Sequence, residues 1–129
     1  MRINRGKFAK EVIMPGYTLS ELSERLSQCR MLVIGDVMLD RFFHGRVNRI
    51  SPEAPIPIIQ IDNEIKMLGG AGNVARNAVA LGVETKLIGL IGNDDSGKEL
   101  IDLANNINGL DPTFITINNR KTTEKIRYS

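Results

Sequence analysis

The sequence predicts an α/β fold with a mostly parallel sheet and helices on both of its faces. Short apolar runs at residues 31–34 and 85–91 are typical of buried strands, and segments with helical periodicity accompany them. Strands that alternate with helices are joined by right-handed crossovers, so neighbouring strands run parallel. With 129 residues, 42% of them hydrophobic, the chain is long enough for one modest core, so we expect one domain or part of one.

The N-terminal segment, residues 1–30, is predicted to be a leader followed by a helix. Residues 1–17 mix charged residues with Gly and Pro and show no periodicity. Thr18-Leu19-Ser20-Glu21 fits a capping box, and leucines then recur at helical spacing up to about residue 29. The remaining domain is expected over residues 31–129.

The next segments are a buried strand and a projecting flap. Met31-Leu32-Val33-Ile34 is an unbroken apolar run and is therefore expected to be a strand covered on both faces. Between residues 42 and 68 the chain has three prolines, several isoleucines and few helix signals. Such a stretch is typical of exposed or edge strands with tight turns, so we expect a β flap over about residues 42–68.

The rest of the chain alternates helix and strand. Small residues precede the second helix, Gly82 ends it, and Asn108-Gly109 ends the third. The segments expected in order are a helix at 73–81, a strand at 85–91, a helix ending before Asn108, a strand at 113–117 and the start of another strand at Thr122.

Composition and charge narrow the classes of function. The formal net charge is +2 and the pI is near 8.8, too close to balance to indicate the concentrated basic face that nucleic-acid binding needs. The single cysteine, Cys29, cannot form an intrachain disulfide and indicates a reducing compartment. Because no continuous apolar run follows the basic N-terminus, we expect no secretory signal, no membrane span and a cytoplasmic location.

Two carboxylates, Asp36 and Asp40, follow the first predicted strand. Ligands of open α/β sheets bind outside the carboxyl ends of the strands, and charged acceptors suit sugar hydroxyls. The alternative is that Asp36 only forms the turn and that Asp40 is a solvated surface residue. Spacing alone gives the two interpretations about equal weight.

A glycine-rich turn, Gly69-Gly70-Ala71-Gly72-Asn73, leads into the second helix. Unpaired N–H groups at a helix N-terminus favour anions and polar ligands, and glycines allow a close approach or a hinge. Asn73 alternatively caps the helix. Residues 70–75 also fit the dinucleotide-binding pattern G-x-G-x-x-G/A, but those glycines should follow the first buried strand, where this chain has Gly35-Asp36.

A polar segment at residues 120–127 starts the last predicted strand. If it is extended, Thr123, Lys125 and Arg127 share one face, because side chains alternate along a strand. Two cations and a hydroxyl on one face could hold a phosphate group. The alternative, an edge strand that carries charge against aggregation, is about equally supported.

Taken together, these motifs resemble the N-terminal half of ribokinase-type carbohydrate kinases of the PfkB family. The resemblance rests on Val33-Ile34-Gly35-Asp36, on residues 69–75 and on residues 89–97. Within that family, Met38-Leu39-Asp40-Arg41 and residues 49–57 are similar to the kinases of D-glycero-β-D-manno-heptose 7-phosphate. The resemblance implies a ribokinase-like fold whose N-terminal half is present here, with the flap as its β lid.

The resemblance also implies site residues, partners and a reaction. The acids and the asparagine would contact sugar hydroxyls, the paired glycines would form a hinge, and the two cations would lie near the 7-phosphate. The β lid would cover the sugar and pair with the lid of a second subunit in a homodimer. The reaction would transfer the γ-phosphate of ATP, with Mg²⁺, to O1 and give the 1,7-bisphosphate for ADP-heptose and lipopolysaccharide synthesis. The implied substrate-binding residues are Asp36, Asp40, Gly69, Gly70, Asn73, Lys125 and Arg127.

One family signature is absent from the sequence. The late Gly-Ala-Gly-Asp element, which would supply an anion hole and the catalytic aspartate, does not occur. No catalytic residue and no metal ligand is therefore assigned, and ATP and Mg²⁺ would be bound mainly by the missing C-terminal half. We expect this chain to bind substrate but to be inactive alone. The alternatives are another ribokinase-like sugar kinase, or a non-catalytic fragment for sugar-phosphate binding or dimerisation.

Overall fold

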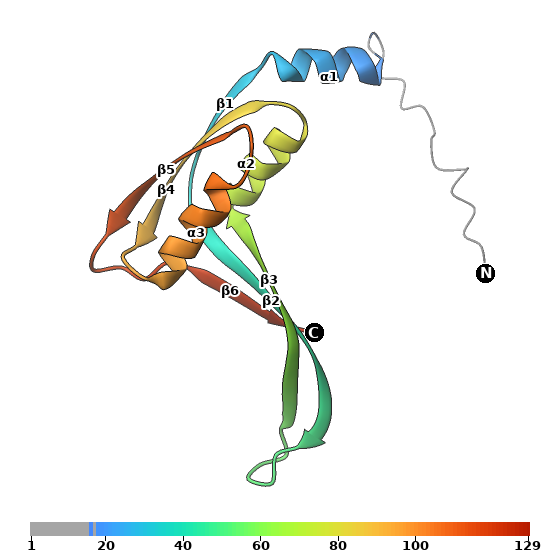
Figure 1. Ribbon diagram of the computed structural model, residues 1–129, viewed down its shortest axis with the longest axis vertical. Helices are drawn as coiled ribbons and strands as arrows, with labels where there is room; N and C mark the ends of the chain where they lie inside the picture. Colours follow the sequence, from blue (N-terminus) through green and yellow to red (C-terminus); the bar gives the residue numbers. More distant parts are fainter. Residues whose placement is uncertain (1–15, 17) are drawn as a thin grey trace, which may run out of the picture.

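The computed structural model describes Gly16 and residues 18–129, which form the helices and strands labelled in Figure 1. Apart from Gly16, the leader predicted for residues 1–17 lies outside them. Each predicted helix and strand has a counterpart, with ends that differ by a few residues. In chain order the elements are α1 (Leu19–Ser27), β1 (Arg30–Ile34), β2 (Val37–Ile50), β3 (Pro57–Gly70), α2 (Ala71–Ala80), β4 (Glu84–Gly92), α3 (Asp95–Asn105), β5 (Leu110–Ile117) and β6 (Glu124–Tyr128).

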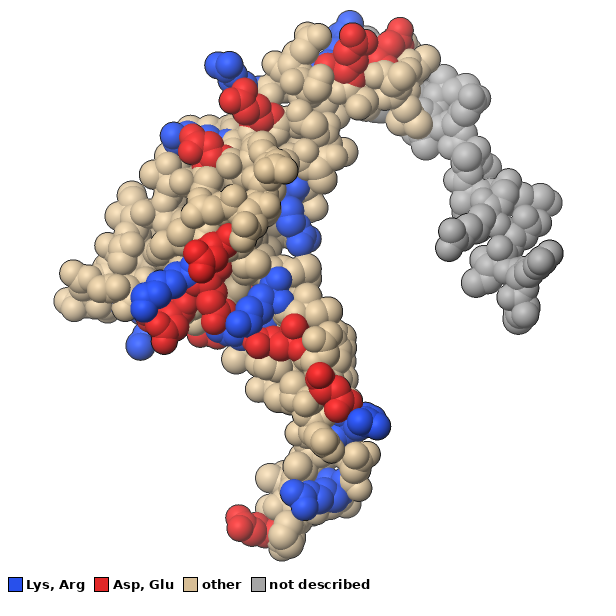
Figure 2. All heavy atoms as spheres, in the orientation of Figure 1, with Lys and Arg blue, Asp and Glu red and all other residues tan. Residues whose placement is uncertain are grey.

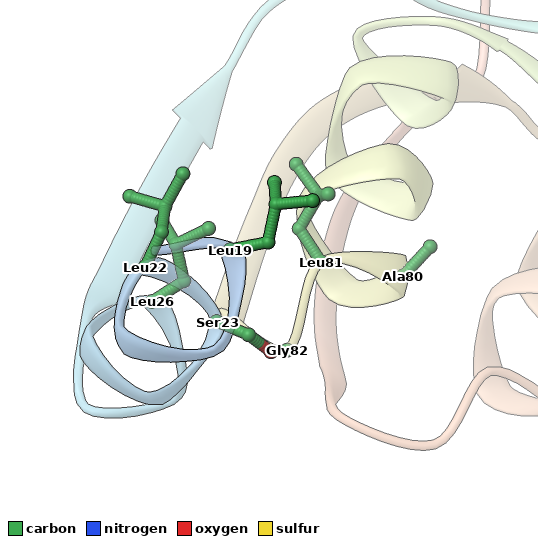
Figure 3. Close-up of a pocket in the computed structure, with 7 residues that line it drawn as sticks. All are labelled: Leu19, Leu22, Ser23, Leu26, Ala80, Leu81 and Gly82. Carbon is green, nitrogen blue, oxygen red and sulfur yellow. The ribbon is translucent and has the colours of Figure 1, made fainter. Parts of the chain in front are cut away.

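Helix α1 begins with the capping box that the sequence predicts. The Thr18 hydroxyl accepts from the Glu21 N–H at 3.3 Å, and the Glu21 carboxylate accepts from the Thr18 N–H at 2.7 Å. Leucines on one side of the helix and residues 80–82 at the end of α2 line a small pocket (Figure 3). No residue of α1 is buried, so the helix contacts the body only along this apolar edge.

The strands form two three-stranded sheets, one of them parallel and the other including the projecting hairpin. The first has the order β1-β4-β5, and both of its strand pairs are parallel. In the second, β2 pairs antiparallel with β3 and parallel with β6. The chain passes from the first sheet to the second between β1 and β2, at Gly35 and Asp36. The α/β class with mostly parallel strands is confirmed.

The core lies between the first sheet, helices α2 and α3, which pack on the same face of that sheet, and the base of the second sheet. Its buried members are Val37, Leu39, Leu68, Ala75, Leu87, Ile91, Leu100 and Ala104. The opposite face is open, since Leu32 is 56% exposed and Ile115 is 53% exposed. The prediction that the first strand is covered on both faces is therefore wrong for the described residues, because side chains alternate along β1 and only one face meets helices.

Strands β2 and β3 form a long hairpin that projects from the body (Figure 1). The strand pairing begins at Val37, earlier than the flap predicted over about residues 42–68. Pro52 and Pro55 lie in the turn, where a missing N–H removes no ladder hydrogen bond. Because the paired strands join the body directly, the base of the hairpin is part of the second sheet.

A cluster of charged side chains links the hairpin to β6 and α3, and acidic and basic groups alternate over this part of the surface (Figure 2). Arg41 on β2 contacts Glu64 on β3 at 2.6 Å, Glu124 on β6 at 2.7 Å and Glu99 on α3 at 3.0 Å. Desolvation of Arg41 opposes its charge, but these contacts outweigh it and raise the pKa of Arg41 above its ordinary value. The guanidinium therefore stays charged and holds β6 beside β2.

Candidate functional site

One face of the β3-β2-β6 sheet carries three of the charged residues singled out in the sequence, Asp40, Lys125 and Arg127. Residues paired in register on neighbouring strands point to the same face. The register places Asp40 opposite Lys125 and Phe42 opposite Arg127. Arg41, between Asp40 and Phe42, points to the other face, into the charged cluster. We call the face with Asp40, Phe42, Lys125 and Arg127 the open face.

Asp40 has a carboxylate that the described residues do not satisfy. Its Oδ1 atom is buried and has no hydrogen-bond partner among them. A Cβ atom on residue 69 would lie 2.8 Å from both Cγ and Oδ2 of Asp40. Because Gly69 has no side chain, the carboxylate of Asp40 has room at this position. A buried acceptor without a partner is costly, and a hydroxyl donated by a ligand would remove that cost.

Gly70 is the last residue of β3, directly before α2, and it lies against the loop that follows β1. Its φ is +58°, a conformation that favours glycine, and a Cβ atom there would clash with the carbonyl oxygen of Asp36. That carbonyl accepts from the Ala71 N–H at 2.8 Å. The glycine-rich turn thus meets both acids, Asp40 at Gly69 and Asp36 at Gly70. The side chain of Asp36 itself is exposed.

Asn73 lies in the first turn of α2 but does not cap it. The N-cap residue is Gly70, and no side chain makes a capping hydrogen bond there, so the capping interpretation of Asn73 is wrong. The Oδ1 atom of Asn73 accepts from Nη2 of Arg76 at 3.1 Å, while Nη1 of Arg76 lies 3.2 Å from the sulfur of Met67. With Oδ1 engaged, the Nδ2 group of Asn73 is left to donate.

Lys125 and Arg127 are exposed on the edge strand β6. The guanidinium carbon of Arg127 lies 4.7 Å from the centroid of the Phe42 ring. Among Gly16 and residues 18–129, neither cation has a carboxylate within ion-pair distance. Both charges therefore remain available to an anion.

A hydrogen-bonded junction fixes the start of β6. Asp94 accepts at Oδ1 from the Thr122 hydroxyl (2.6 Å) and the Gly97 N–H (2.9 Å), and at Oδ2 from the Thr122 N–H (2.9 Å). The Thr122 hydroxyl, followed by the N–H groups of Thr122 and Gly97, lowers the pKa of Asp94. The hydroxyl in turn accepts from the Gly92 N–H at 2.9 Å. The end of β4 and the start of α3 thus position the strand that carries the two cations.

Four residues that contribute to this region are not assigned to it by sequence reasoning. Arg76 could have been found, since it lies three residues after Asn73 and so on the same side of a helix. Asp94 and Gly97 have N-cap spacing, which identifies the helix start but not the partner Thr122. Nothing in the sequence identifies Phe42, because its contact depends on the register between β2 and β6.

The described part of the chain has neither a cluster of potential metal ligands nor a membrane-spanning helix. Within it, no group of three or more His, Cys, Asp or Glu side chains could hold a metal ion. None of its helices is both long enough and apolar enough to cross a bilayer.

Comparison with known proteins identifies the family. The pfkB family carbohydrate kinases match residues 30–127. The bifunctional protein HldE of Caulobacter sp. strain K31 is 52% identical over 111 residues, which are 86% of this chain and 23% of that protein. The D-beta-D-heptose 7-phosphate kinase of Bordetella bronchiseptica is 44% identical over 105 residues, 81% of this chain and 33% of that protein. The chain thus spans between a fifth and a third of these relatives.

Solved structures agree with this assignment. A carbohydrate kinase from Agrobacterium tumefaciens has a TM-score of 0.59 and 25% identity, covering 78% of this chain and 31% of that structure. The phosphofructokinase-2 from Escherichia coli in complex with fructose-6-phosphate has a TM-score of 0.58, covers 78% of this chain and 30% of its own, and, at 22% identity, shows the fold alone. The ribokinase-like fold is therefore confirmed, and the chain belongs to the pfkB family of carbohydrate kinases.

Proposed function

We propose that this chain is the substrate-binding N-terminal part of an ATP-dependent kinase that phosphorylates O1 of D-glycero-β-D-manno-heptose 7-phosphate. The observation that carries the proposal is the buried Oδ1 of Asp40, which has no hydrogen-bond partner among the described residues. It lies on the face that also bears Lys125 and Arg127, and within the same residues neither cation has a carboxylate at ion-pair distance. A sugar phosphate offers hydroxyls to the carboxylate and a dianion to the cations. The similarity to HldE and to the heptose 7-phosphate kinase favours heptose 7-phosphate as the sugar.

The residues around the glycine-rich turn would then divide the recognition of the sugar. Asp40 and Asp36 accept from sugar hydroxyls, whereas the Nδ2 group of Asn73 donates to a sugar oxygen, because Arg76 engages its Oδ1. Gly69 and Gly70 connect the hairpin to α2 and are proposed as the hinge on which the β lid moves. Donors and acceptors placed on different elements select the orientation of the sugar.

ATP and Mg²⁺ are the co-substrate and metal of this proposal. In phosphoryl transfer, Mg²⁺ bridges the phosphates and neutralises the charge that develops on them. This chain spans 23% of the HldE relative, and we propose that ATP and Mg²⁺ are bound mainly by parts of the kinase outside that span. The span alone is expected to bind sugar phosphate without turnover. The product would be the 1,7-bisphosphate on the route to ADP-heptose and lipopolysaccharide.

The proposal is tested in the full-length protein by calorimetric titration with heptose 7-phosphate and by ³¹P NMR of the product. Asp40→Asn should weaken sugar-phosphate binding about 10- to 150-fold, the range for a hydrogen bond to a charged group, and leave ATP binding unchanged. Asp62→Asn is the matched control, because Asp62 lies on the same hairpin but pairs with Arg46. Arg127→Ala should weaken the binding of heptose 7-phosphate far more than the binding of ATP. An equal loss for both ligands, or a phosphate at a position other than O1, contradicts the proposal.

A homodimer is the second proposal, and a separate observation favours it. The outer half of the hairpin exposes apolar side chains, with Val47 at 56%, Ile50 at 68% and Ile61 at 49% exposure. Exposed apolar residues that gather on a projecting element are typical of an interface. Pairing with the hairpin of a second copy would cover them. Sedimentation should show a dimer, and a monomer at micromolar concentration would refute the pairing.

A further inference from the structure

The guanidinium of Arg127 lies over an aromatic ring at the edge of the open face. The guanidinium carbon lies 4.7 Å from the centroid of the Phe42 ring, and the two residues are paired in register on β6 and β2. We propose that Phe42 positions Arg127 and thereby makes the site selective for sugars that carry a phosphate group. This inference rests on the proposed function, in which Arg127 meets the phosphate.

The two partners differ in how firmly they are held. β2 is the central strand of its sheet, between β3 and β6, and Phe42 is half-buried. β6 is a five-residue edge strand that pairs only with β2 among the described strands, and all of its residues are exposed. The ring is therefore the fixed partner, and the long side chain of Arg127 is the one that the stack orders.

Stacking orders the guanidinium without consuming its hydrogen bonds. The guanidinium carbon lies over the ring, and a cation–π contact uses none of the N–H donors, so these remain available to a phosphate. An exposed cation–π contact corresponds to about a 2- to 5-fold change in an equilibrium constant. Bidentate binding of phosphate needs a fixed guanidinium plane, so this ordering should appear as affinity for the phosphate group alone.

A cation on the opposite face of the same strands has a different role. Arg41 forms ion pairs with Glu64, Glu99 and Glu124, so carboxylates of the fold neutralise its charge. Among the residues that the structure describes, Arg127 has no carboxylate within ion-pair distance and is oriented by the Phe42 ring. A cation that is ordered but not neutralised is suited to an incoming anion.

The same pair of strands supplies a matched control. Phe43 and Tyr128 are the next pair in register, and their rings stack on the opposite face with centroids 5.3 Å apart. Phe43→Leu removes an aromatic stack from the same strands without touching Arg127. Phe42→Tyr keeps the ring and should still position Arg127, whereas Phe42→Leu removes the ring.

The experiment measures, in the full-length protein, the Kd for heptose 7-phosphate and for the unphosphorylated heptose, and the KM for ATP. Phe42→Leu should raise the Kd for heptose 7-phosphate about 2- to 5-fold. It should leave the Kd for unphosphorylated heptose and the KM for ATP unchanged. Phe42→Tyr and Phe43→Leu should bind heptose 7-phosphate as the unmodified protein does. In NMR spectra, the Arg127 Nε–Hε signal should lose its ring-current shift in Phe42→Leu only.

A double-mutant cycle with Arg127→Met separates positioning from a general effect on folding. If Phe42 acts through Arg127, adding Phe42→Leu to Arg127→Met changes the Kd no further. An equal loss for phosphorylated and unphosphorylated heptose, or the same loss in Phe43→Leu, overturns the inference. If Arg127→Met raises the Kd for heptose 7-phosphate but Phe42→Leu does not, only the positioning role of Phe42 is refuted. If Arg127→Met leaves that Kd unchanged, Arg127 does not bind the phosphate, and both this part of the proposed function and the present inference are refuted.

Discussion

Gly69→Ala tests the link between the glycine-rich turn and Asp40. The new Cβ atom would lie 2.7 Å from Cγ of Met38 and 2.8 Å from both Cγ and Oδ2 of Asp40. Gly69 is not among the glycines with positive φ, so the effect is steric and not a backbone penalty. The flexible Met38 side chain can turn away, but the carboxylate of Asp40 must leave the position at which we propose that it accepts from the sugar.

The size of the effect follows from these contacts. Overpacking of this kind costs about 1–3 kcal/mol of the free energy of unfolding. Loss of a hydrogen bond to a charged group costs about 1.5–3 kcal/mol of binding, which is about 10- to 150-fold in Kd. We therefore expect Gly69→Ala to fold with reduced stability and to bind heptose 7-phosphate at least about 10-fold more weakly, as measured by calorimetry beside urea unfolding.

Gly89→Ala is the control for the steric part of this change. A Cβ atom there would lie 2.8 Å and 2.9 Å from the two Cγ atoms of Val37, in the core and not on the open face. It should lower stability comparably and leave affinity unchanged. Adding Gly69→Ala to Asp40→Ala should cause no further loss of binding. Our reasoning is refuted if Gly69→Ala binds as tightly as the unmodified protein, or if the two changes are additive.

Two further predictions concern the junction at the start of β6. Thr122→Val keeps the shape of the side chain but removes the hydroxyl that contacts Asp94 and Gly92. The free energy of unfolding, measured in urea, should fall by about 1–3 kcal/mol. Thr122→Ser keeps the hydroxyl and should retain most of that stability. Because the pKa of Asp94 is lowered in the folded state, its contribution to stability is present above the ordinary carboxyl pKa of about 4 and is lost as the pH falls through the lowered value. Urea unfolding followed from about pH 6 down to about pH 2 should therefore show a smaller loss of stability in Asp94→Asn. If the unfolding free energies of the variant and of the unmodified protein fall in parallel with pH, this assignment is contradicted.

Local patterns in the sequence predict the elements well. The capping box at Thr18, the end of α2 before Gly82 and the strand at 85–91 are all present, because each depends on hydrogen bonds or side-chain periodicity within a few residues. The alternation that places Lys125 and Arg127 on one face is likewise local, and β6 is extended there. Sequence reasoning also singled out Asp40 and Gly69, but it could not show that the two meet.

Contacts between distant segments were decided only by the tertiary structure. The register between β2 and β6 places Phe42 beside Arg127, and the packing of β4 and α3 brings Asp94 to Thr122, 28 positions away. The packing of α2 and α3 on one face likewise left β1 exposed on the other, against the sequence-based expectation. Strand register and layer packing depend on which segments meet, and no pattern within one segment encodes that. The sequence by itself therefore determined the α/β class and the residues that could bind a sugar phosphate, whereas the tertiary structure decided which of them share a face and what holds them there.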